Sequence, residues 1–124
     1  MQPEARLNEG IKKFMQAEVD RGFLKEQKVM KIHGSQFQEA GTPDLLIGFV
    51  YKETTVVMFV EAKVGNNKPT PIQERRLKEW GKIMATAAVW DLQAFENFYM
   101  DVLRNIERTG VYQGYYGWYK TKDV

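Results

Sequence analysis

The sequence predicts an α/β protein in which a mixed β-sheet is flanked by helices. Stretches with apolar residues at helical spacing stand near both ends of the chain, and a capped helix start lies between them. Short runs of apolar, β-branched or aromatic residues alternate with these stretches. Such alternation is typical of α/β folds, and the expected element order is α-β-β-β-α-β-α.

The first predicted helix runs from Pro3 to about Asp20, with proline at a plausible first-turn position. Its apolar side chains recur at helical spacing: Leu7, Ile11, Phe14, Met15 and Val19. At about 100° per residue, Glu4 and Glu18 lie on the same side as this apolar stripe. Both carboxylates are therefore expected to point toward the core.

Three strands are predicted next, of which the last two form a hairpin. A short strand fits Val29 to His33, and a glycine-containing loop follows it. The runs Leu45 to Tyr51 and Thr55 to Ala62 are rich in apolar and β-branched residues, and Lys52-Glu53-Thr54 separates them. The second run is apolar on both faces, so we expect a central strand that is covered on both sides.

A second helix is predicted to begin at Thr70-Pro71-Ile72-Gln73, which supplies an N-cap, a first-turn proline and a capping-box glutamine. Its expected inward residues are Ile72, Leu77, Trp80 and Met84. A buried strand over Ala85 to Trp90 and a last helix from Leu92 to about Arg108 complete the order. The apolar side of this last helix comprises Leu92, Phe95, Phe98, Tyr99, Val102, Leu103 and Ile106.

Length and composition limit the possible functions. The 124 residues predict one domain over residues 1–124, with a core at about 4–90 and a C-terminal helix and aromatic tail at 91–124. The chain has no cysteine and one histidine, which excludes disulfides, thiolate nucleophiles and the usual zinc sites. Any metal must be held by oxygen. No apolar run approaches the roughly 20 residues that cross a bilayer, so we expect a cytoplasmic protein without membrane contact.

Charge is distributed unevenly along the chain. The net charge of +2 indicates little, but residues 63–82 contain six cations against two anions. A local basic face of this kind can follow a phosphate backbone. A solvated helix surface explains the same run equally well when charge is considered alone.

The predicted hairpin brings charged residues together. If it turns around Lys52-Glu53, Asp44 lies opposite Glu61, and opposed Cβ atoms are about 4.5 to 5.5 Å apart, so the two carboxylates can share one divalent cation. Lys63, two residues beyond Glu61, points to the same face. Taken alone, this strand end is better explained by a simple surface ion pair, because such pairs are frequent.

The segment Gly41-Thr42-Pro43-Asp44, followed 17 residues on by Glu61-Ala62-Lys63, resembles the motif of the PD-(D/E)XK nuclease superfamily. Its VRR-NUC branch, with stand-alone phage-type members, is more similar still. Three features carry that closer resemblance: Glu4, Lys31-Ile32-His33-Gly34 and Lys68-Pro69-Thr70-Pro71-Ile72-Gln73. The similarity spans roughly Glu4 to Trp90, and nothing after Arg108 matches.

The resemblance implies a restriction-endonuclease-like core and a metal site for Mg²⁺ or Mn²⁺. Asp44, Glu61 and the backbone carbonyl of Ala62 would be ligands, and Lys63 would position the attacking water or stabilise negative charge. Glu4 would be an additional ligand, and Glu18 competes with it for this role. Gln73 either completes a capping box or lies near the metal, and the two roles can coexist.

Several residues are candidates for contacts to DNA. Lys31 and His33 share one strand face and can reach phosphates, although a lone histidine is more often structural. Other cations available for phosphate contacts are Lys68, Arg75, Lys78 and Lys82. The aromatic segment Tyr112 to Tyr119 either stacks on unpaired bases or forms a terminal strand or subunit contact, and the second interpretation is favoured.

The function that these features imply is metal-dependent cleavage of structured DNA. The resemblance implies an endonuclease, of phage or prophage origin in the host cytoplasm, that acts as a homodimer on branched, Holliday-junction-like DNA. A nuclease acting on flaps, DNA ends or RNA is an alternative within the superfamily. A DNA-binding protein that keeps the fold without cleavage is the alternative from another class.

Overall fold

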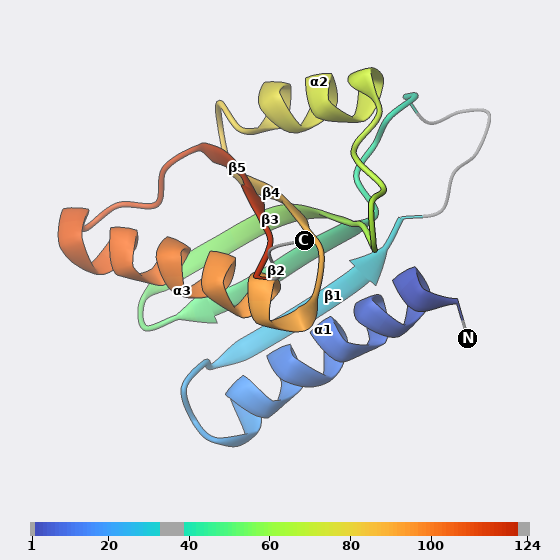
Figure 1. Ribbon diagram of the computed structural model, residues 1–124. Helices are drawn as coiled ribbons and strands as arrows, with labels where there is room; N and C mark the ends of the chain where they lie inside the picture. Colours follow the sequence, from blue (N-terminus) through green and yellow to red (C-terminus); the bar gives the residue numbers. More distant parts are fainter. Residues whose placement is uncertain (1, 33–38, 122–124) are drawn as a thin grey trace.

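The computed structural model describes residues 2–32 and 39–121, which form three helices and one five-stranded sheet (Figure 1). The elements in chain order are α1 (Pro3–Asp20), β1 (Glu26–Lys31), β2 (Leu45–Tyr51), β3 (Thr54–Ala62), α2 (Pro71–Trp80), β4 (Ala85–Val89), α3 (Leu92–Thr109) and β5 (Tyr115–Tyr119). The α/β class with a mixed sheet between helices is confirmed. The observed order adds a fifth strand, β5, to the predicted one.

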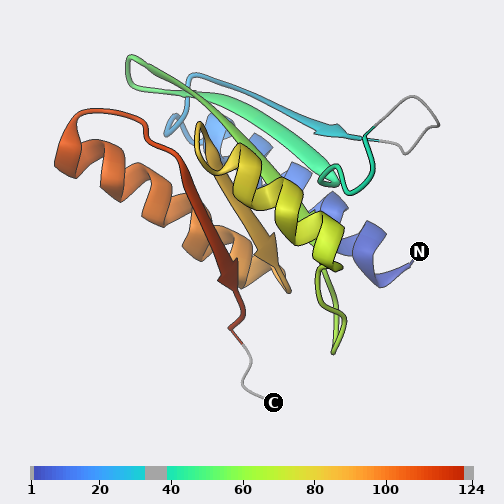
Figure 2. The same cartoon turned by 90° about the horizontal axis from the view of Figure 1, so that it is seen from above.

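The strands lie in the sheet in the order in which they occur in the chain, from β1 to β5. The pairs β1–β2 and β2–β3 are antiparallel, whereas β3–β4 and β4–β5 are parallel. The two parallel connections run through α2 and α3. Helix α2 covers one face of the sheet, and α1 and α3 cover the other (Figures 1 and 2).

The main core lies between the sheet and the helices α1 and α3. Strand β2 alternates strictly between buried and half-buried residues, as expected for a strand with one face on the core. Helix α3 contributes Phe95, Phe98 and Tyr99, all fully buried. The ring of Tyr99 meets those of Phe14 and Phe49 edge to face, at centroid distances of 5.3 and 5.6 Å.

Strand β3 is the central strand that its apolar sequence predicts. Val56, Met58, Val60 and Ala62 point into the main core and are completely buried. The alternate side chains point to the α2 face, where Phe59 meets Trp80 of α2 edge to face at 5.0 Å. Glu61 therefore belongs to the α2 face, two residues beyond Phe59.

The hairpin has the predicted register and a shorter turn. Leu45 pairs with Val60 and Tyr51 with Thr54, so the turn is the two residues 52–53, and the next position outward places Asp44 opposite Glu61. Lys52 has a φ of 52°, in the left-handed region that tight hairpin turns require. The position of the turn thus determines that Asp44 and Glu61 lie opposite each other.

Several boundaries and placements differ from the prediction. Strand β1 ends at Lys31, and His33 lies outside the described residues. Leu92 was expected on the apolar side of α3 but is 37 % exposed, because the first turn of α3 lies at the rim, beside Gly10 of α1. Met84 lies beyond α2, which ends at Trp80.

The aromatic tail is part of the sheet, as the favoured interpretation predicts. Strand β5 pairs with β4 from Tyr115 to Tyr119 and forms one edge of the sheet. Tyr112, just before it, is anchored by its hydroxyl group, which accepts a hydrogen bond from Ala85 N (2.6 Å) and donates one to the carbonyl of Val57. The sheet therefore includes residues up to Tyr119.

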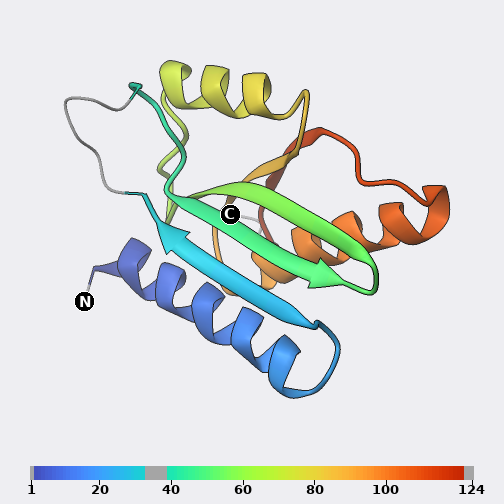
Figure 3. The same cartoon turned by 180° about the vertical axis from the view of Figure 1, so that it is seen from behind.

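Several helix and strand ends meet at one end of the sheet. The start of α1, the end of β1 and the start of β2 lie there, together with the ends of β3, β4 and β5 (Figures 2 and 3). No helix in the described part of the chain is long and apolar enough to span a membrane.

Candidate active site

Asp44 is held at the end of the sheet by both neighbouring strands. Its carbonyl oxygen accepts a hydrogen bond from Ile32 N (2.7 Å), and its Oδ2 accepts one from Ala62 N (3.2 Å). Lys31 Nζ lies 3.4 Å from the other carboxylate oxygen, Oδ1. The backbone of β1 and β3 thus fixes Asp44 next to the end of β3, with its carboxylate partly exposed.

Glu61 is a buried carboxylate with an unsatisfied oxygen. The residue is 2 % exposed, and its Oε1 has no hydrogen-bond partner within residues 2–32 and 39–121. Its Oε2 lies 3.6 Å from Lys63 Nζ and 3.4 Å from Gln73 Nε2. A buried acceptor without a partner is costly, so this oxygen is available to a bound group or to a proton shared with Asp44.

Electrostatics at Glu61 lead to the same conclusion. Burial raises the pKa of its carboxyl group to about 8, with a further contribution from the charge of Asp44, and Lys63 opposes this rise only in part. In the metal-free protein, Glu61 therefore holds a proton over much of the neutral range. A cation placed between Asp44 and Glu61 would oppose this rise, because it would stabilise the ionised form of both carboxylates.

Lys63 continues the line of β3 and is almost as buried as Glu61. Its N–H donates to the carbonyl of Val89 (2.9 Å), and its side chain is 11 % exposed. The structure thus gives each carboxylate its own lysine, Lys63 for Glu61 and Lys31 for Asp44. The pairing of Lys31 with Asp44 was not predicted, because Lys31 was assigned only to phosphate contacts.

The donor set fits a hard divalent cation that retains several waters. Two carboxylates, Asp44 and Glu61, are in place, and the backbone carbonyl of Ala62 stands between Glu61 and Lys63 in the chain. In the described part of the chain, no three acidic or histidine side chains gather closely enough to hold a metal by themselves. Mg²⁺ is commonly bound through one or two carboxylates plus waters and substrate phosphate, so two carboxylates suffice for it.

Glu4 and Glu18 lie in different environments. Glu4 stands in the first turn of α1, and its charge contributes to the raised pKa of Glu61. Glu18 is near the other end of the same helix, where it pairs with Arg21. Of the two predicted competitors, only Glu4 lies near the carboxylate pair.

Sequence reasoning missed Asn8, which lies one turn beyond Glu4. Asn8 is 8 % exposed, and its Oδ1 has no hydrogen-bond partner among the described residues. A polar residue on the apolar stripe of α1 was the available signal. Like Glu61 Oε1, Asn8 Oδ1 is a buried acceptor without a partner, and it lies on α1, the helix that also carries Glu4.

Gln73 forms the predicted capping box and also reaches Glu61. Its N–H and its Oε1 form the two hydrogen bonds of the capping box with Thr70, at 3.2 and 2.9 Å. Its Nε2 points the other way and donates to Glu61 Oε2. The start of α2 is therefore tied directly to the buried carboxylate.

The loop before Asp44 packs against the same helix start. Gly41 has a φ of 81°, and a Cβ atom there would stand 2.8 Å from the carbonyl oxygen of Ile72. Only glycine fits such an approach. Arg76 adds a hydrogen bond from Nε to the carbonyl of Ala40 (3.1 Å), so α2 fixes the loop that leads into Asp44.

The predicted phosphate-binding cations of α2 are largely paired within the helix. Arg75 lies 3.5 Å from Glu79, and Lys78 lies 3.7 Å from Glu74. These exposed i,i+4 pairs are weak and can open toward phosphate. Lys68 is exposed in the loop after β3, and Lys82 is exposed beyond the C-terminal end of α2.

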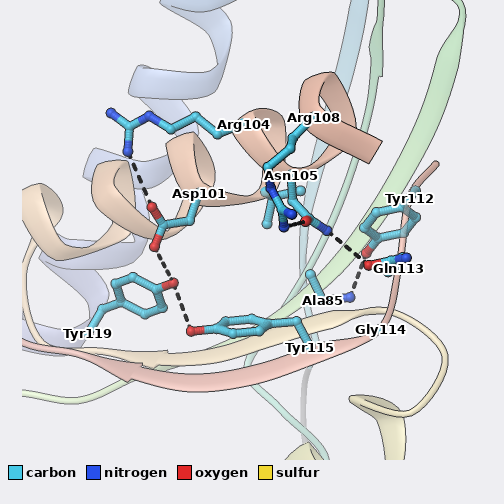
Figure 4. Close-up of a pocket in the computed structure, with 11 residues that line it drawn as sticks. Ala85, Asp101, Arg104, Asn105, Arg108, Tyr112, Gln113, Gly114, Tyr115 and Tyr119 are labelled. Atoms are coloured by element: carbon cyan, nitrogen blue, oxygen red, sulfur yellow. Dashed lines mark hydrogen bonds and ion pairs between the residues drawn. The ribbon is translucent and has the colours of Figure 1, made fainter. Parts of the chain in front are cut away.

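A separate pocket of about 550 Å³ lies between α3 and β5, on the opposite face of the sheet from Glu61 (Figure 4). Tyr119 donates to Asp101 Oδ2 (2.7 Å), and its oxygen is 3.0 Å from the hydroxyl of Tyr115. A hydroxyl donates only one hydrogen bond, so Tyr115 donates to Tyr119 in turn. These hydrogen bonds connect β5 to α3. None of the predicted site residues lines this pocket.

The fold and the site define an α/β protein with a mixed sheet and two carboxylates, each beside its own lysine, at the end of its central strands. Comparison with known proteins does not assign the chain to a family. No family model matches the sequence, and no match was found among curated proteins or solved structures.

Proposed function

We propose that this protein is a Mg²⁺- or Mn²⁺-dependent endonuclease of the PD-(D/E)XK type, with its active site at Asp44, Glu61 and Lys63. The observation that carries the proposal is the buried carboxylate of Glu61. It has one unsatisfied oxygen, and it lies opposite Asp44 and 3.6 Å from the ammonium group of Lys63. Structural ion pairs are normally exposed or fully hydrogen-bonded, and this one is neither.

The residues of the chain have distinct tasks in this proposal. Asp44 and Glu61 would hold the cation, with Ala62 and Glu4 as further oxygen ligands. When bound, the cation supplies Lewis-acid activation of a phosphodiester and lowers the pKa of a water molecule. Lys63 orients the attacking water and stabilises the negative charge that develops on phosphate oxygen as the bond from phosphorus to the leaving oxygen breaks.

Gln73 and Lys31 keep these groups in position. Gln73 is anchored in the capping box of α2 and holds one oxygen of Glu61, which leaves the other oxygen available for the cation. Lys31 holds one oxygen of Asp44 through their ion pair, at 3.4 Å. Both residues orient a carboxylate, and both contacts come from elements outside the hairpin.

We propose branched DNA as the substrate and a homodimer as the active form. The exposed cations Lys68, Arg75 and Lys78 suit phosphate contacts, which carry little base information. Selectivity would then come from two active sites held at a fixed distance. Sedimentation and junction titration test this part of the proposal, which is refuted by a monomer that cuts linear duplex and junctions equally fast.

The chemistry is tested with labelled duplex, flap, single-stranded and four-way-junction DNA, incubated in Mg²⁺, Mn²⁺ or chelator. Cleavage is expected with either metal and is expected to disappear in chelator. The variants Asp44→Asn and Glu61→Gln should abolish it, whereas the matched surface variant Glu9→Gln should not. Cleavage that survives both site variants, or that needs no metal, refutes the assignment.

A further inference from the structure

The strand register connects the proposed active site to an aromatic side chain on the edge of the sheet. Glu61 of β3 pairs with Ala88 of β4, and Ala88 pairs with Trp118 of β5. Paired residues of neighbouring strands point to the same face, so Glu61 and Trp118 share the α2 face. They are two strand spacings apart, about 10 Å, and only the methyl group of Ala88 lies between them in this row.

Trp118 is held in place although much of it faces solvent. It is 44 % exposed, whereas its neighbour Trp90 is 7 % exposed. The two rings are 5.2 Å apart at their centroids and tilted by 49°, and Trp118 Nε1 donates to the hydroxyl of Tyr116 at 2.5 Å. We call Tyr116, Trp90 and Trp118 the aromatic shelf.

The aromatic shelf is also tied to the loop that follows the active site. Trp90 Nε1 donates to the carbonyl of Asn67 (2.9 Å), in the loop between Lys63 and α2. The shelf therefore lies at the same end of the sheet as the carboxylates, where β4 and β5 end (Figure 2). Its position relative to Glu61 is set by backbone pairing and by this hydrogen bond.

A cation stands beside the shelf. Lys120 Nζ is 4.9 Å from the centroid of the Trp90 ring. Two acidic residues lie near the shelf, and both have partners. Glu74, beside the hydroxyl of Tyr116, pairs with Lys78 at 3.7 Å. Asp91, which follows Trp90 in the chain, accepts hydrogen bonds from Ala94 N (2.8 Å) and from the hydroxyl of Thr121 (2.6 Å). An exposed ring with an ammonium group beside it suits a planar base attached to phosphate.

We propose that the aromatic shelf stacks an unpaired nucleobase of the DNA whose phosphate occupies the site at Asp44 and Glu61. This inference rests on the proposed nuclease function and names its substrate class, DNA with an unstacked base close to the cut. At about 3.4 Å per stacked nucleotide, 10 Å corresponds to about three nucleotides. A fully paired duplex offers no free base face, so the shelf favours DNA with an unstacked base over continuous duplex DNA.

The test measures binding rather than cleavage, with metal removed by chelator. Fluorescence anisotropy compares two labelled DNAs of the same sequence, one a continuous duplex and one with a gap of three unpaired nucleotides. Trp118→Ala is expected to weaken binding of the gapped DNA by about tenfold and to leave duplex binding unchanged. Trp118→Phe, which keeps an aromatic face, should retain most of the affinity.

A matched control is Ile83→Ala, since Ile83 is 67 % exposed in the turn before β4 and lies outside the shelf. It should change neither affinity. Thermal melting of all variants establishes that they fold. If Trp118→Ala does not fold, the comparison rests on Trp118→Phe. Equal losses on both DNAs, or none on the gapped DNA, overturn the proposal.

Two further outcomes separate this inference from the function on which it rests. If the protein cuts DNA in Mg²⁺ but Trp118→Ala does not distinguish the two DNAs, the shelf is refuted and the nuclease stands. If Trp118 governs binding of the gapped DNA but no DNA is cut, the nuclease is refuted. A dimer that Trp118→Ala converts to monomer, with equal losses on both DNAs, assigns the exposed ring to a subunit contact and also overturns the shelf.

Discussion

The variant Glu61→Gln keeps the size of the side chain and removes its charge. We expect it to stabilise the metal-free protein at neutral pH, because the carboxylate is buried beside Asp44 and its pKa is raised to about 8. The native state therefore binds this proton more tightly than the unfolded chain does. As pH rises, the unfolded state releases the proton first, so native stability falls across the interval between the two pKa values.

The structure sets the size of this effect. With a pKa of about 8 in the native state and 4.5 in the unfolded chain, linkage gives a loss of about 3 kcal/mol between pH 5 and pH 7.5. Other groups titrate over the same range, so the informative quantity is the difference between wild type and Glu61→Gln. Urea unfolding in chelator at both pH values measures it, and Glu9→Gln reports the effect of replacing a surface carboxylate.

Added Mg²⁺ should act in the opposite direction. At pH 7.5 it should raise the stability of the wild type, since it neutralises both carboxylates, and it should leave Glu61→Gln nearly unchanged. A difference between wild type and variant that is constant from pH 5 to pH 7.5 would refute the reasoning about Glu61. Equal stabilisation of both proteins by Mg²⁺ would place the metal elsewhere.

Further predictions concern catalysis and the loop before Asp44. Lys63→Ala should abolish cleavage while the far-ultraviolet circular dichroism spectrum stays unchanged, and a cleaving variant would exclude the proposed role. Glu4→Gln should slow cleavage more than Glu18→Gln, because only Glu4 lies near the carboxylates, and gel rates in excess Mg²⁺ decide the order. Ca²⁺ should support cleavage poorly, since it polarises water less than Mg²⁺ does, and full rates in Ca²⁺ would contradict this. Gly41→Ala should cost at least about 2 kcal/mol in urea unfolding, from its positive φ and the close carbonyl of Ile72, and an unchanged midpoint would contradict the packing described.

The parts of the fold that were predicted correctly depend on chemistry within a few residues. The start of α2 follows from Thr70, Pro71 and Gln73, whose capping box is formed as expected. The hairpin register follows from a turn around 52–53, and it brings Asp44 opposite Glu61. In both cases the interacting residues are close in the chain, so local rules suffice.

The parts that were missed depend on contacts between distant segments. Lys31 reaches Asp44 only because β1 pairs with β2 in one particular register. The place of β5 depends on parallel pairing with β4, which the aromatic sequence of Tyr115–Tyr119 does not specify. The burial of Glu61 depends on α2 lying over it, and no pattern within β3 predicts that.

The agreement between strand order and chain order has a consequence for synthesis on the ribosome. Each strand pairs with the one made just before it, so the antiparallel part can form as soon as residue 62 has emerged. Both carboxylates are then present, but Gln73 and Val89, which hold Glu61 and Lys63, are still to come. At about 5 to 20 residues per second, the nascent chain carries an incomplete site for about one to five seconds, until β4 has been made. The site is therefore completed after the antiparallel part of the sheet and before β5 is added at its edge.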